Sequence, residues 1–147
     1  MAQYNTLLLA VDLSEDSTHV AARAMAIAAN GTTSVHLVHV IEPLSFAYGG
    51  DIPMDFSGIQ DEIHQQAKLQ LTRFADELGI PEERQHLLLG KPEVEIHATA
   101  QSLDADLIVL GSHGRSGLAL LMGSTANGVL HGAACDVLAV RVGKEED

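Results

Sequence analysis

The stretch LIVLGSHGRSGLALLMGST, residues 107–125, carries the pattern that most clearly predicts the architecture of this chain. Its first four residues are all aliphatic, which predicts a short strand buried on both faces. A glycine-rich segment follows at once, and Gly123, Ser124 and Thr125 are expected to begin a helix. A strand that leads through a tight turn into a helix is the repeating unit of α/β proteins.

The same alternation continues on both sides of this stretch. Helical apolar stripes separate four further runs that predict strands, at residues 6–11, 35–41, 86–89 and 137–142. We expect Ser14 to be the N-cap of the first helix and Pro92 to lie in the first turn of another. Gly79 should end the long helical stripe that begins near Ile59. Residues 44–55 are predicted to form a long loop.

The order βαβαβαβαβ predicts a single α/β domain over residues 1–147, with an acidic tail at about 143–147. Strands joined through helices must be parallel, with right-handed crossovers. We therefore expect a doubly wound, Rossmann-like parallel sheet of five strands in the order 3-2-1-4-5, with helices on both faces. Such sheets bind ligands where the winding reverses, which would bring together Asp12 and the segment that begins at Gly111.

Charge and composition restrict the classes of partner. The formal net charge is −12, from eight Lys plus Arg against 20 Asp plus Glu, so no general attraction for DNA, RNA or anionic lipid is expected. No apolar run reaches the roughly 20 residues that span a bilayer, and the first residues are not typical of a signal peptide. The single cysteine, Cys135, suits a reducing cytoplasm.

The glycine-rich segment has the composition of a phosphate site. Gly111 and Gly114 would let the backbone approach a ligand closely, and a helix N-terminus presents free N–H groups. Ser124 and Thr125 add hydroxyl donors, and Arg115 could neutralise one phosphate charge. The alternative is that the glycines only shape a loop and that Ser124 only caps a helix.

Several segments together resemble the universal stress protein family. GSHGRSGLALLMGSTANGVL (111–130), followed by CDVLAVRV (135–142), is similar to its C-terminal signature. LLLAVDLSEDS (7–17) and LVHVIEP (37–43) resemble its other two landmarks, so the likeness covers essentially the whole chain. The ATP-binding branch has G-x2-G-x9-G-[ST], whereas eight residues separate Gly114 from Gly123 here. A sister branch without nucleotide binding also has Asp-Leu-Ser after its first strand, as at Asp12.

The resemblance implies a cytoplasmic stress-response sensor or regulator that binds an adenine nucleotide, ATP or AMP, with or without Mg²⁺. Asp12 would contact the adenosine, unless it only caps the first helix or its loop, and the backbone of Val40 would meet the adenine. The other implied nucleotide-binding residues are Gly111, His113, Gly114, Arg115, Gly123, Ser124 and Thr125. Hydrolysis would be slow or absent, because no general base or Walker-type lysine is visible.

The last strand is predicted to be an apolar edge strand, which invites pairing with a second chain. The resemblance implies a homodimer through this strand, with Val137, Leu138, Val140 and Val142 at the interface. The alternative is an edge covered by its own chain. A nucleotide-free dimeric module that acts through protein partners is the second functional hypothesis.

Other kinds of site have weaker support. The chain has no HExxH or CxxC motif, and His36 and His39 should point to opposite faces of a strand, so no metal site is expected. The segment from Gly114 to Gly117 is one residue too short for a hydrolase nucleophile elbow. A receiver domain would need an aspartate after the third strand, and a flavin or dinucleotide carrier would need GxGxxG in the first turn.

Overall fold

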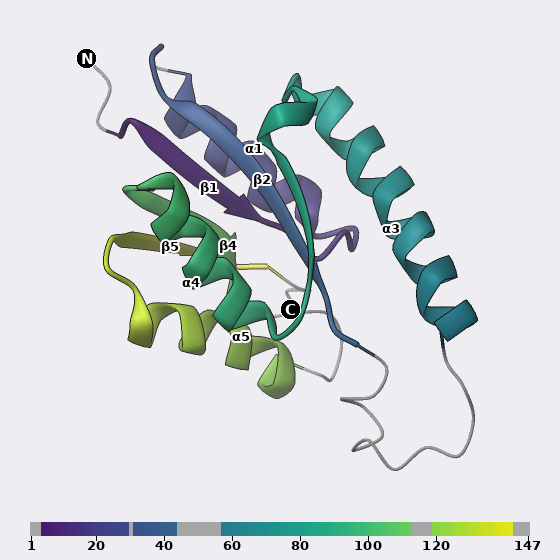
Figure 1. Ribbon diagram of the computed structural model, residues 1–147. Helices are drawn as coiled ribbons and strands as arrows, with labels where there is room; N and C mark the ends of the chain where they lie inside the picture. The colour runs from purple at the N-terminus through teal and green to yellow at the C-terminus, as the bar shows by residue number, and fades with distance from the viewer. Residues whose placement is uncertain (1–3, 30, 44–56, 113–118, 143–147) are drawn as a thin grey trace, which may run out of the picture.

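Five parallel strands form the centre of the molecule in a computed structural model that describes residues 4–29, 31–43, 57–112 and 119–142, of which 57 and 119–124 as backbone only. The strands are β1 (Thr6–Ala10), β2 (Ser34–Ile41), β3 (Gln85–Leu89), β4 (Leu107–Gly111) and β5 (Asp136–Val140). They lie in the order β3-β2-β1-β4-β5, which confirms the predicted order and winding (Figure 1).

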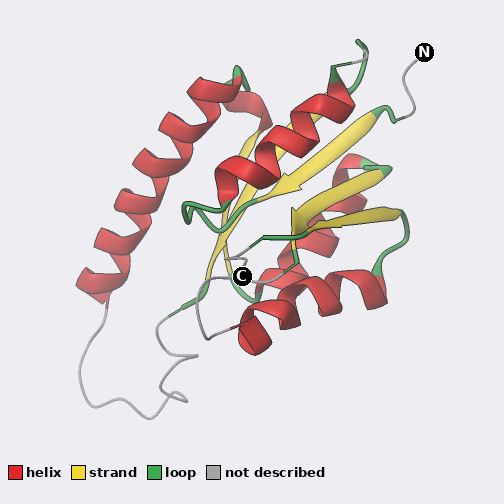
Figure 2. Ribbon diagram, turned by 180° about the vertical axis from the view of Figure 1, so that it is seen from behind, coloured by secondary structure: helices red, strands yellow, loops and turns green. Residues whose placement is uncertain are grey.

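Helices cover both faces of the sheet (Figure 2). On one face lie α1 (Ser17–Ala28) and α3 (Ser57–Leu78), and on the other lie α4 (Pro92–Leu103) and α5 (Ala119–Gly132). Side chains of β1 alternate between these layers: Leu7 and Leu9 join the core under α1 and α3, whereas Leu8 joins the core under α4 and α5. A strand covered on both sides must be apolar at every position, which explains its continuous aliphatic run.

Two helix ends follow the predicted chemistry. Gly79 takes a left-handed conformation (φ 75°), and the Ile80 N–H donates to the Ala75 carbonyl at 2.9 Å, the hydrogen bond of a Schellman motif. Gly79 therefore ends α3 as expected. Pro92 is the first residue of α4, where its missing N–H costs no helical hydrogen bond.

The predicted start of the first helix was wrong. The N-cap of α1 is Asp16, without a side-chain capping bond, and Ser14 lies in the preceding turn. Ser14 is unavailable as a cap because its hydroxyl donates to Asp12 at 2.6 Å and its carbonyl accepts from the Ser17 N–H at 3.0 Å.

The predicted start of the last helix was also wrong. α5 begins at Ala119, so Gly123, Ser124 and Thr125 lie in its second turn and not at its N-terminus. The residues Ala-Leu-Leu-Met at 119–122 are all strong helix formers, which accounts for the earlier start. The predicted loop at 44–55 and the acidic tail at 143–147 lie outside the described residues.

Candidate functional site

The carboxyl ends of β1 and β4 lie side by side at the point where the winding reverses. These strands pair in parallel from Leu7 with Leu107 to Leu9 with Val109. Asp12 follows the end of β1, and Gly111 is the last residue of β4. The sheet therefore brings Asp12 and Gly111 to the same edge, as the topology predicted.

Asp12 organises the turn between β1 and α1. Its Oδ1 accepts hydrogen bonds from the Ser14 N–H at 3.0 Å, the Ser14 hydroxyl at 2.6 Å and the Ser17 hydroxyl at 3.0 Å. The first of these bonds closes an Asx turn. Leu13, inside this turn, has a φ of 63°, a strained conformation for a leucine. The turn thus holds the Asp12 carboxylate in one place.

The Asp12 carboxyl stays ionised well below neutral pH. Partial burial of the carboxylate raises its pKa, but the hydrogen bonds from Ser14 and Ser17 outweigh that effect and lower the pKa below its ordinary value. Because an ionised carboxylate only accepts hydrogen bonds, Asp12 suits a ligand that presents hydroxyl donors. The sequence left open that Asp12 only caps the first helix or its loop. In the structure Asp12 bonds within the loop and does not cap α1.

His39 lies beside this turn and terminates the ladder between β1 and β2. The last backbone bond of that ladder joins the Val11 N–H to the Val38 carbonyl at 3.0 Å. The next acceptor, the Val11 carbonyl, lies 2.8 Å from His39 Nδ1. Since a carbonyl can only accept, Nδ1 carries the proton and donates it.

Strand alternation sets the direction of the Val40 backbone. Alternate residues of a parallel strand bond to alternate neighbours, so the N–H and C=O of Val40 point toward β1, as those of Val38 do. Val40 lies beyond the last paired position of the β1–β2 ladder, Ala10 with Val38. Its main-chain groups therefore face the side of β2 on which β1 ends.

Gly111 is closely packed by its neighbours. A Cβ at this position would meet Val20 of α1 and Val142 at 3.4 Å, the close limit of ordinary van der Waals contact. A small residue therefore suits the packing here, whether or not a ligand approaches. The Ser112 N–H continues the β4–β5 ladder by donating to the Val140 carbonyl at 2.8 Å.

The remaining predicted ligands are only partly described. His113, Gly114 and Arg115 lie outside the described residues, and Gly123 and Ser124 are described as backbone within α5. Thr125 is half-buried in the same helix. Among the described residues, no cluster of three or more His, Cys, Asp or Glu side chains could hold a metal ion.

Two contributors to the site were missed at the sequence level. Ser17, almost fully buried, was not recognised as a partner of Asp12, although its spacing five residues on was available. His39 was considered only as a metal ligand. Nothing in the sequence indicated that its ring would take the acceptor that Val40 would otherwise use.

β5 forms one edge of the sheet, because among the described strands it pairs only with β4. Of the four predicted interface residues, Val140 and Val142 are buried in the chain's own core, and Val137 and Leu138 are half-buried against it. Pairing with a second chain would therefore use mainly the main-chain groups of this edge. Within the part of the chain that the structure describes, no helix is both long and apolar enough to cross a bilayer.

Comparisons with known proteins agree on one family. A profile described as "Universal stress protein family" matches residues 3–141. Universal stress protein A homolog 1 of Coxiella burnetii is 42% identical over 139 residues, which cover 93% of this chain and 96% of that protein.

Two solved structures share the fold. Hypothetical protein MJ0577 superposes with a TM-score of 0.77 at 23% identity and covers 98% of this chain and 99% of its own. A universal stress protein in complex with cAMP has a TM-score of 0.59 at 24% identity, covering 93% and 96%.

Proposed function

The chain belongs to the universal stress protein family, and from this premise we propose that it binds an adenine nucleotide, ATP or AMP, at the carboxyl ends of β1 and β4. It would act in the cytoplasm as a sensor or regulator in a stress response. The observation that carries the proposal is the ionised Asp12 carboxylate, held by Ser14 and Ser17 at the carboxyl end of β1, next to the end of β4.

Val40 would recognise the base. Adenine offers an amino group as donor and ring nitrogens as acceptors, which complement one C=O and one N–H of a strand. His39 supports this role because its bond to the Val11 carbonyl competes with the Val40 N–H for that acceptor. Recognition by main-chain groups depends on the backbone and not on the identity of the side chain.

Asp12 would bind the ribose. An ionised carboxylate is an acceptor only, and the two ribose hydroxyls are donors that complement it. The three bonds from Ser14 and Ser17 all end on Oδ1, so a ligand would use the other oxygen, Oδ2. The negative charge of Asp12 also argues that the phosphates lie away from it, toward the glycine-rich segment.

The phosphates would be held by His113, Gly114 and Arg115 together with Gly123, Ser124 and Thr125, and Mg²⁺ would accompany ATP. Arg115 supplies local positive charge in a chain of net charge −12. Backbone binding by Gly123 requires α5 to begin later in the bound protein, because an N–H beyond the first turn is already hydrogen-bonded within the helix. Hydrolysis would be slow or absent.

Relatives give the proposal independent support. One family member has been solved with cAMP, an adenine nucleotide, although its identity to this chain is only 24%. The test is thermal unfolding of the nucleotide-stripped protein with millimolar Mg-ATP, AMP, cAMP or GTP. A ligand present at 100 times its Kd should stabilise the native state by about 2.7 kcal/mol.

The variants decide where a ligand binds. The adenine nucleotides should raise the midpoint by several degrees and GTP should not. Asp12→Asn and the double variant Gly114→Ala, Ser124→Ala should each reduce the shift, whereas His131→Gln, on the exposed part of α5, should keep it. No shift in the folded wild-type protein would contradict the proposal.

The second candidate is a nucleotide-free dimeric module that acts through protein partners. Its support is the shortened spacing between Gly114 and Gly123 and the open edge of β5. Sedimentation of the wild-type protein and of an Ala139→Pro variant tests the dimer, because proline in an edge strand removes a main-chain donor. A concentration-dependent dimer without any nucleotide shift would favour this function.

A further inference from the structure

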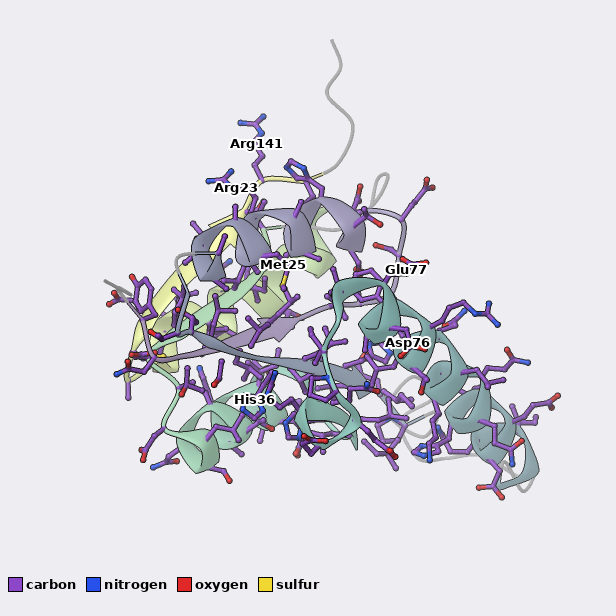
Figure 3. The ribbon with its side chains drawn as sticks, turned by 90° about the horizontal axis from the view of Figure 1, so that it is seen from above. Arg23, Met25, His36, Asp76, Glu77 and Arg141 are labelled. Carbon is purple, nitrogen blue, oxygen red and sulfur yellow. The ribbon has the colours of Figure 1, made fainter. Side chains whose placement is uncertain are left out.

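Two histidines of the neighbouring strands β2 and β3 meet at the edge of the sheet, on the side of β1 away from β4. His36 Nδ1 of β2 and His86 Nε2 of β3 are 3.1 Å apart. Both residues lie on the α4 side of the sheet, because their strand neighbours Val38 and Leu88 join the core under α4 and α5. Figure 3 labels His36 on this face. β3 forms the edge of the sheet opposite to β5, because among the described strands it pairs only with β2.

The rings share a hydrogen bond and do not chelate. Their centroids are 5.3 Å apart and their planes differ by 23°, so the centroids are about one ring diameter further apart than the two nitrogens. The facing nitrogens therefore point at each other, and one must donate while the other accepts. A metal ion would need lone pairs that converge on one point, and no third ligand stands near among the described residues.

The surroundings of the pair disfavour positive charge. Both rings are partly buried, which lowers the pKa of each, and the charges of His86 and Arg84 lower that of His36 further. Arg84 is fixed beside the strands because its Nε donates to the Val35 carbonyl at 3.2 Å.

α4, the helix packed on this face, brings no compensating carboxylate. Glu93 and His97 lie against Gly128 and Gly132 of α5, and Glu95 lies over Gly90. α3 contributes its charges on the opposite face of the sheet. Arg84 is thus the charged neighbour that the pair meets within the described residues.

We propose that His36 and His86 form an acid-sensitive link that ties the edge strand β3 to β2. The hydrogen bond is kept when both rings are neutral, and also when one added proton is shared between them. When each ring carries an added proton, both facing nitrogens are donors, and two positive charges lie beside Arg84. β3 then loses a side-chain tie to β2 and opens more readily, which exposes the edge of β2. This link does not depend on nucleotide binding.

The pH window follows from the direction of the pKa shifts. Both imidazoles bind protons less readily in the folded chain than in the unfolded chain, where their pKa is 6.5. The link therefore contributes its full stability above about pH 6.5 and loses it as the pH falls below that value. Asp12 and Asp106, whose pKa values lie below 3.8, lose their contributions only in stronger acid.

Hydrogen exchange of the folded protein, read by mass spectrometry at pH 7 and pH 5 and corrected for intrinsic exchange, tests the link. Between these pH values the protection factors of residues 85–89 should fall by at least about tenfold, which corresponds to one pKa unit. The protection factors of β1 and β4 should not change. His36→Gln removes one titrating ring, so its loss of protection should be smaller. The control His131→Gln should behave as the wild type.

Titration of the histidine ring protons by NMR in the wild-type protein provides a readout that needs no variant to fold. His36 and His86 should titrate below pH 6.5, the ordinary value of an imidazole, in two separated steps. The proposal is overturned if both rings titrate together at or above that value, or if His36→Gln loses protection of residues 85–89 as steeply as the wild type does.

Discussion

His97 of α4 donates its Nε2 proton to the main-chain carbonyl of Val129, 2.8 Å away in the last turn of α5. Carbonyls of a last helical turn have no partner within their own helix, so a residue from another helix supplies one. The imidazole also lies directly over Gly132, and Glu93 lies over Gly128 one turn earlier. Two glycines spaced four residues apart therefore let α4 approach α5 and fix the helix that carries Gly123, Ser124 and Thr125.

Gly132→Ala should destabilise the protein. A methyl group there would overlap His97 Cε1 and lie 3.0 Å from Nδ1, and the ring is held by its bond to Val129. We expect the free energy of unfolding to fall by about 1–2 kcal/mol, measured by urea denaturation. Gly58→Ala in α3 is the matched control, because a methyl group there meets nothing within 4 Å and alanine favours the helix. Equal effects of the two substitutions would contradict the close contact between α4 and α5.

Asp104→Gly should stabilise the protein. Asp104 ends α4 in a left-handed conformation (φ 55°, ψ 43°), and the next residue completes a Schellman bond from the Ala105 N–H to the Ala100 carbonyl at 2.9 Å. Glycine adopts this conformation without strain, so the free energy of unfolding should rise by about 0.5–1 kcal/mol. Alanine adopts the left-handed conformation less readily than aspartate does. The thermal unfolding midpoint of Asp104→Ala should therefore fall. A loss of stability on Asp104→Gly would show that the aspartate side chain matters more than the backbone.

Asp106 joins the starts of β1 and β4 through its carboxylate. Oδ2 accepts from the Asn5 N–H and Oδ1 from the Thr6 N–H, both at 2.9 Å. Partial burial raises the pKa of this carboxyl, but the two backbone bonds outweigh it and the net shift is downward. The contribution is therefore complete above pH 3.8 and is lost as the pH falls through the lower folded value.

Asp106→Asn should weaken that contribution, because its amide oxygen can still accept one of the two N–H bonds whereas its amide nitrogen cannot accept the other. For a site that is largely open to water, we expect a loss of about 1 kcal/mol at pH 7 and a smaller dependence of stability on pH between 5 and 3. Urea unfolding at these pH values measures both. Asp61→Asn, at an exposed position of α3, should leave both quantities unchanged, and an equal effect there would assign the change to overall charge.

The sequence predicted the sheet because the pattern that determines it is local. Each strand is a short aliphatic run between helical stripes, and parallel connections leave few possible orders. The helix starts near Ser14 and Gly123 were wrong for a different reason. Asp12 competes for Ser14, and the helix-forming residues at 119–122 extend α5.

The residues of the candidate site also fall into some that the sequence could predict and some that it could not. Asp12 and Gly111 could be placed together from topology alone, because both follow strands whose carboxyl ends share one edge. His39 and the His36–His86 pair could not, because each depends on the register between strands, which brings residues into contact that lie 28 and 50 positions apart in the chain. No periodicity in a single chain specifies such contacts.

His39→Leu should weaken nucleotide binding at the proposed site while the chain stays folded. Without the imidazole, the Val11 carbonyl loses its donor, which favours a bond from the Val40 N–H that would extend the β1–β2 ladder by one rung. The donor proposed to recognise adenine would then be used inside the sheet. The matched variant is His39→Asn, whose amide nitrogen can take the place of Nδ1 and donate to Val11. Calorimetric titration with Mg-ATP should show at least a tenfold loss of affinity for His39→Leu and a smaller one for His39→Asn. If both variants bind as the wild type does, His39 has no part in presenting Val40, and the adenine contact must be sought elsewhere.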